Sequence, residues 1–226
     1  MIRINTRILG LLLGISSLAL AGGERPVDYV LPPTDETVQA PDLARFLDDL
    51  RKAVEERNVQ FVQAALAEDV QLGFGPHEDD VNVVTAALND ADSELWQRLE
   101  SSVKFGGTFT SRGERARFCV PYFYSAFPDH LDPLEHQVIV EPSIEALSVP
   151  NESGREIALP DFAIVRTDLG SAATTKDENG RLWARVYLKS GPAYVPATAI
   201  RSPLDSRTCF EKRGSQWRVT AVVAGA

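Results

Sequence analysis

Few side chains in this sequence have the type and spacing that metal binding or catalysis requires. The three histidines each stand near acids: His130, Asp132, Glu135 and His136 lie close together, and His77 precedes three consecutive acids. Such groups can bind metal ions. Neither cluster, however, has ligands at i,i+4 on one helix face or a zinc-type spacing. We therefore expect no metal and no other cofactor.

A cysteine nucleophile is the second chemical possibility, with Cys119 activated by His130 or His136. A nucleophilic cysteine normally opens a helix, where the helix dipole lowers the thiol pKa. Cys119 instead lies in a strand-like run before Pro121. The chain also lacks a glycine-rich phosphate loop, and nothing singles out a catalytic pair of carboxylates. We predict a protein that is not an enzyme.

The first 21 residues have the pattern of a secretory signal peptide. Arg3 and Arg7 precede an apolar run, which ends in the small residues Ala19 and Ala21. The run is too short to cross a bilayer as a helix, and no cysteine follows that could carry a lipid. We expect cleavage after Ala21 and a periplasmic or secreted protein without a transmembrane segment.

The overall charge limits the choice of partners. The chain holds 23 Lys and Arg against 32 Asp and Glu, a net charge of −9. An acidic surface repels a phosphate backbone, so we expect no nucleic-acid partner. The same charge disfavours anionic lipid.

Cys119 and Cys209 are the only two cysteines. In an oxidising compartment an even number favours pairing. Both residues lie in predicted strands, each on the more polar face, where two strands could bring them together. The alternative is two unpaired cysteines that pack as small hydrophobic side chains.

The pattern of apolar residues predicts an α+β protein with five segments. A signal peptide (1–21) and a flexible or extended leader (22–41) precede a helical N-terminal domain with short strands (42–133). In that domain we expect helices capped by Asp42, Asn58 and Ser93, and a strand at 70–74. From 134 to 203 short β runs follow at close intervals, with a long exposed loop at 168–180. Residues 204–226 form a hairpin that packs on the rest.

The β segment resembles the bacterial SH3-like (SH3b) domain. The resemblance rests on Pro150, on Trp183–Val186 in a central strand, and on Gly191–Val195 at the next turn, although Pro192 and Ala193 stand where the family usually has a second glycine. It covers about residues 136–203 and implies a small β-barrel. More broadly, the blocks 118–122, 201–203, 210–212 and 217–225 look like exported bacterial proteins with an SH3-like domain behind a helical half.

The strand at 182–188 carries the candidate ligand-binding residues. Leu182, Ala184, Val186 and Leu188 share the face that we assign to the core. Trp183, Arg185 and Tyr187 share the other face, and Tyr194 lies on the next strand. In SH3-like modules aromatic surfaces of this kind bind extended peptides. The alternative is that Trp183 and Tyr187 pack against the N-terminal half.

Two functions are consistent with these patterns. The first is an exported cell-envelope binding protein whose SH3-like module recognises a peptide, peptidoglycan or protein partner. The second is a small-molecule-binding or hydrolytic cone of the nuclear-transport-factor-like type, with the barrel as an insertion. The second requires a deep pocket in the N-terminal half, lined by Trp96, Phe105 and Phe118.

Overall fold

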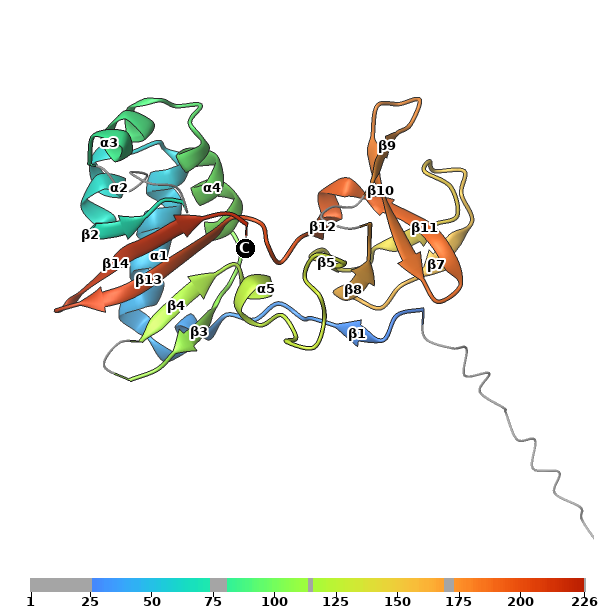
Figure 1. Cartoon of the computed structure of the whole chain (residues 1–226), viewed down its shortest axis with the longest axis horizontal. Coiled ribbons are helices and arrows are strands. Elements are labelled where there is room, and N and C mark those ends of the chain that lie inside the picture. Colours follow the sequence, from blue (N-terminus) through green and yellow to red (C-terminus); the bar gives the residue numbers. More distant parts are fainter. Residues whose placement is uncertain (1–25, 74–80, 114–115, 169–172, 226) are drawn as a thin grey trace, which may run out of the picture.

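The computed structural model describes residues 26–73, 81–113, 116–168 and 173–225. The predicted signal peptide, residues 1–21, lies outside this part of the chain. Two lobes stand next to each other (Figure 1). The first packs helices against a five-stranded sheet, and the second is built on a nine-stranded sheet. The predicted mixture of helices and sheet is confirmed.

The helices of the first lobe lie against its sheet (Figure 1). The apolar side chains at helical spacing pack in one core with those of the strands. Asn58 caps the second helix as predicted, because its side chain accepts a hydrogen bond from the Phe61 amide. Asp42 was expected to cap the first helix, but Ala40 holds that position and Pro41 is the first helical residue. The helices are α1 (Pro41–Glu55), α2 (Val59–Ala65), α3 (Val81–Asn89), α4 (Glu94–Val103) and the short α5 (Tyr122–Ser125).

The sheet of the first lobe joins strands that are distant in the sequence. Its order is β2-β14-β13-β4-β3, and only the β2–β14 pair is parallel. The strand expected at 70–74 begins earlier, at Leu66, and Phe74 lies outside the described residues. The strands are β2 (Leu66–Gln71), β3 (Thr108–Ser111), β4 (Arg117–Val120), β13 (Arg207–Arg213) and β14 (Gln216–Val223).

The second lobe is inserted between two neighbouring strands of this sheet. β4 ends at Val120 and β13 starts at Arg207, yet the two strands pair directly, with Cys119 opposite Cys209. These cysteines form a disulfide with Cα atoms 4.1 Å apart, as predicted. Both cysteines lie on the face that carries the Arg117–Glu211 ion pair, as predicted, and they are buried against Ala221 and Tyr124. The chain therefore leaves the first lobe and returns to it at neighbouring positions, which the disulfide joins.

The second lobe follows the path β12-β5-β8-β10-β11-β6-β7, with β1 and β9 as side branches. The expected closed barrel is not formed in the described residues, because the end strands β12 and β7 do not pair with each other. The strands are β1 (Tyr29–Val30), β5 (His136–Ile139), β6 (Glu145–Leu147), β7 (Glu156–Ala158), β8 (Ala163–Arg166), β9 (Thr174–Lys176), β10 (Leu182–Leu188), β11 (Gly191–Pro196) and β12 (Ile200–Arg201).

Two expected loops contain regular structure. β9 lies within the predicted exposed loop at 168–180 and pairs with β10. The leader contributes β1, which pairs antiparallel with β8, and a 3-10 turn at Glu36–Gln39. Farther along, the Glu36 amide donates to the Gly107 carbonyl. The leader thus contacts both lobes along its course (Figure 1).

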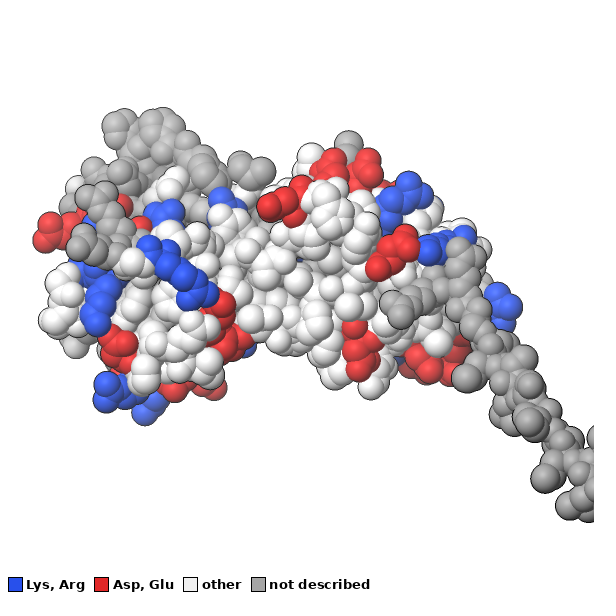
Figure 2. Space-filling view, turned by 90° about the horizontal axis from the view of Figure 1, so that it is seen from below, with Lys and Arg blue, Asp and Glu red and all other residues white. Residues whose placement is uncertain are grey.

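Each lobe has its own apolar core. Trp96 and Phe118 are fully buried in the first core, and the Trp96 indole donates to the Leu88 carbonyl. A separate cluster includes Leu31, Tyr122, Phe123, Val138 and Ile164, and it joins the leader to both lobes. On the face seen in Figure 2, charges of both signs are interspersed on the lobes, while the middle is largely uncharged.

None of the helices in the described part of the chain has the length and apolar character needed to cross a membrane.

We predict that the disulfide contributes strongly to stability. The double variant C119A/C209A should lose about 4 kcal/mol of unfolding free energy, because the bond closes a 90-residue separation and restricts the unfolded chain. Urea unfolding of the two proteins measures the difference. A loss below about 1 kcal/mol would contradict this prediction.

The terminal hairpin should be indispensable for folding. β13 and β14 occupy the middle of the first sheet, and Trp217 is only 7% exposed. Removing so large a buried side chain costs about 3–5 kcal/mol, a large share of a typical domain's stability. W217A, or truncation after Ser206, should give insoluble or unfolded protein. A truncated chain with unchanged circular dichroism would show that the hairpin is dispensable.

Candidate functional site

The face of β10 that carries the predicted binding residues surrounds one carboxylate, that of Asp168. Arg185 Nη2 donates to both oxygens of Asp168, at 3.0 and 3.2 Å, and the Tyr187 hydroxyl donates to Oδ1 at 2.9 Å. We call Asp168, Arg185 and Tyr187 the Asp168 cluster. Alternation along β10 makes it possible, because Ala184 and Val186 point into the core and leave Arg185 and Tyr187 on the other face.

The neighbours of Asp168 favour the ionised form of its carboxyl group. The hydrogen bonds from Arg185 and then Tyr187 hold the pKa of Asp168 below its usual range. The same contact with Asp168 raises the pKa of the Tyr187 hydroxyl, so this group stays a donor. The guanidinium carbons of Arg166 and Arg185 lie 5.2 and 5.6 Å from the centre of the Tyr187 ring. The carboxylate of Asp168 therefore holds an aromatic ring that two guanidinium groups approach.

Trp183 does not belong to this surface. It was expected to face outward with Arg185, but it is only 2% exposed. Its indole donates to Asp177 Oδ2 at 2.9 Å, and the Arg181 guanidinium covers the ring at 4.6 Å. Pairing with β9 accounts for this burial. Conversely, Leu182, which was assigned to the core, is 49% exposed.

Tyr194 remains beside the cluster. It pairs with Arg185 across the β10–β11 ladder and is half-buried. A groove of about 260 Å³ is lined by Tyr187, Arg166, Lys189 and the leader residues Asp28 and Tyr29. The partly exposed surface of the predicted set thus reduces to Arg185, Tyr187 and Tyr194.

The histidine groups do not converge. His136 Nδ1 lies 3.0 Å from the Asp132 carbonyl oxygen, and the His130 ring packs edge-on against Tyr29. In residues 26–73, 81–113, 116–168 and 173–225, no three potential ligands are grouped as a metal site requires. The third histidine, His77, lies outside these ranges.

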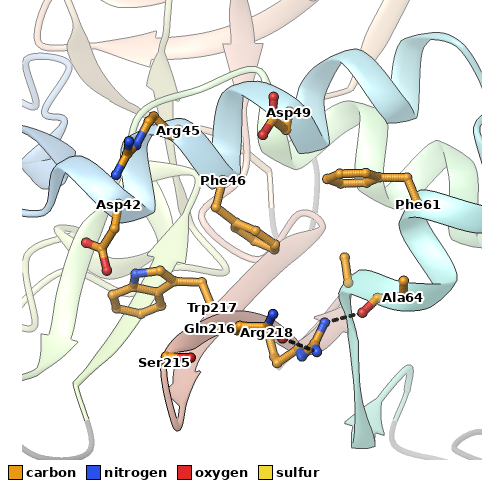
Figure 3. A pocket seen from close by; sticks show the side chains of 11 residues that line it. Asp42, Arg45, Phe46, Asp49, Phe61, Ala64, Ser215, Gln216, Trp217 and Arg218 are labelled. Atoms are coloured by element: carbon orange, nitrogen blue, oxygen red, sulfur yellow. Dashed lines mark hydrogen bonds between the residues drawn. The ribbon is translucent and has the colours of Figure 1, made fainter.

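A pocket between α1, α2 and the start of β14 was not predicted from the sequence. Its volume is about 420 Å³, within the usual range for small-molecule sites. Figure 3 shows Phe46 and Phe61 projecting from the two helices toward Gln216 and Arg218. We call it the helix–hairpin pocket. No local pattern could indicate it, because its walls come from segments that are about 150 residues apart.

This pocket differs from the one that the nuclear-transport-factor-like alternative requires. Trp96 and Phe118 are fully buried in the first core. Phe105 packs edge-on against Phe123, with ring centres 5.1 Å apart, in the cluster that joins the lobes. These three side chains therefore pack in two different apolar clusters and do not together line the deep pocket that this alternative requires.

Comparison with known proteins gives no relative: no family model, no curated protein and no solved structure matches this chain. The geometry of these two surfaces therefore provides the basis for assigning a function.

The Asp168 cluster makes a pH-dependent contribution to stability that D168N should remove. A carboxylate whose pKa is lowered by folding stabilises the protein above its unfolded pKa, and this stabilisation is lost as the pH falls through the folded value. The thermal midpoint of D168N should therefore lie below that of the wild type at pH 7, and the gap should narrow below about pH 4. A gap that stays constant from pH 7 to pH 2 would contradict this assignment.

Proposed function

We propose that this chain is an exported binding protein of the cell envelope, in which residues 134–203 form an SH3-like module. The module would recognise an extended peptide, either in a peptidoglycan stem or in a protein partner. The observation that carries the proposal is the aromatic ring of Tyr187, which lines a groove and is held by a hydrogen bond to Asp168.

A preformed aromatic surface suits the recognition of extended chains. A ring that is already fixed loses little conformational entropy when a partner packs on it. Tyr187 is fixed at its hydroxyl by Asp168 and on its ring by Arg166 and Arg185. Tyr194 adds a second half-buried ring one strand away.

The leader gives a precedent for binding of this kind. β1 pairs with β8 through Tyr29–Ile164 and Val30–Ala163, and the Leu31 amide donates to the Phe162 carbonyl at 2.8 Å. An extended segment therefore already lies against this sheet through main-chain hydrogen bonds, the mode of β-strand addition. A partner in the groove would lie beside the leader.

The charges around the groove indicate an acidic or carboxylate-bearing partner. Arg166, Arg185 and Lys189 surround Tyr187. Asp168 already neutralises much of Arg185 and Asp28 pairs with Lys189, whereas Arg166 is exposed and stacks on the ring. In an otherwise acidic protein, this local excess of arginine favours a carboxylate near the ring.

The test is capture of the purified protein on peptidoglycan sacculi. The variants Y187A and Y194A should each reduce the bound fraction, while the thermal midpoint falls by only a few degrees, because both rings are half-buried. L182A is the matched control, since Leu182 is on the same strand and largely exposed. It should bind like the wild type.

Two results would contradict the proposal. One is equal capture of the wild type, Y187A and Y194A on sacculi. The other is a large loss of stability in both tyrosine variants, which would make the rings part of the core.

A further inference from the structure

The helix–hairpin pocket is a second hollow, on the first lobe, and it shares no lining residue with the groove at Tyr187. Its walls are mainly apolar. Phe46 and Phe61 are half-buried, and the Phe46 ring also packs edge-on against Phe210 in the core. Two phenyl rings that stay partly open above a fixed floor can take up a flat apolar group.

Arg218 lies at the floor of this pocket with an uncompensated charge. Its Nη1 donates to the Ala64 carbonyl and its Nη2 to the Gln216 side-chain oxygen, and both acceptors are neutral. In the part of the chain that the structure describes, Arg218 forms no ion pair. The guanidinium is thus positioned in advance, and a ligand anion would supply the missing counter-charge.

The carboxylates of the pocket do not compete for Arg218. Asp42 accepts from Lys212 Nζ at 2.6 Å, a bond that lowers the Asp42 pKa and keeps this carboxylate occupied. Asp49 stands on the opposite side of the two phenyl rings from Arg218 (Figure 3). Arg45 also lines the pocket and forms no ion pair among the described residues.

Three more charged side chains lie near Arg218, outside the helix–hairpin pocket. A neighbouring hollow between α2 and β2 contains Glu68, Asp69 and Arg213 on the other side of Arg218. Asp69 already pairs with Arg213 at 3.2 Å. Glu68 is exposed and lies beyond ion-pair distance of Arg218.

We propose that the helix–hairpin pocket binds a small organic carboxylate with a flat apolar body. The carboxylate meets Arg218, with Arg45 at the rim, and the body lies against Phe46 and Phe61. This site is independent of peptide recognition by the second lobe, so either proposal can fail without the other.

The first experiment varies only the head group of the ligand. Isothermal titration calorimetry compares 2-naphthoate, the neutral 2-naphthylmethanol and the cationic 2-naphthylmethylammonium, which share one ring system. The carboxylate should bind at least about tenfold more tightly than the alcohol, the effect of one charge-assisted hydrogen-bonded pair. The ammonium compound should bind most weakly.

The second experiment varies the protein. R218Q should remove the preference for 2-naphthoate over the alcohol, and F61A should weaken both ligands by similar factors. R117Q is the matched control: Arg117 is on β4 of the same sheet, pairs with Glu211, and lines neither this pocket nor the neighbouring hollow. It should retain the preference.

Circular dichroism of each variant checks the fold, and R218K gives a second version of the test if R218Q unfolds. Lysine keeps the charge but lacks the fork of donors, so the preference should shrink without disappearing. The proposal would be overturned by equal or weaker binding of 2-naphthoate than of the alcohol. No binding of any of the three compounds at millimolar concentration would also overturn it, as would an unchanged preference in a folded R218Q.

Discussion

The Cys119–Cys209 disulfide is the constraint on which the rest of the architecture depends. It joins β4 to β13, two adjacent strands between which the chain builds the whole second lobe. The bond limits the separation of the two ends of this long insertion, which is where an unfolded chain would have most freedom. β13 and β14 can therefore complete the first sheet only if the two ends of the insertion lie next to each other.

The leader provides a second connection between the lobes. Val27 is buried in the core of the second lobe, Leu31 in the cluster between the lobes, and the Glu36 side chain accepts from the Phe109 amide in the first. Gly106 allows this close approach, because a Cβ there would lie 2.5 Å from the Thr34 carbonyl oxygen of the leader. The leader thus connects the two lobes by non-covalent contacts, while the disulfide joins the strands at the two ends of the insertion.

The two surfaces proposed for binding differ in how their charges are satisfied. Arg185 is neutralised by Asp168, so the second lobe offers a rigid aromatic ring with residual positive charge from Arg166. Among the described residues Arg218 is held by neutral acceptors and forms no ion pair, so the pocket of the first lobe offers a positive charge beside apolar rings. The first arrangement suits an extended partner that contacts many groups weakly. The second suits a compact ligand with one strong polar contact.

The sequence by itself determined the features that depend on local periodicity and on turn chemistry. These include the helix of α1, the cap at Asn58, the hairpin of β13 and β14, and the alternation of β10. The pairing of the cysteines was predicted from their even number and strand parity, but the unpaired alternative stayed open until the structure joined Cys119 to Cys209. Only the tertiary structure decided which segment packs against each face of a helix or strand. The parity of β10 placed Trp183 beside Arg185, but pairing with β9 buried it. Asp168 and Arg218 gained their roles from partners on other segments, and the helix–hairpin pocket exists because β14 returns to α1 and α2 from the far end of the chain. The periodicity of apolar residues specifies which side chains share a face of a helix or strand, whereas long-range packing determines which segment covers that face.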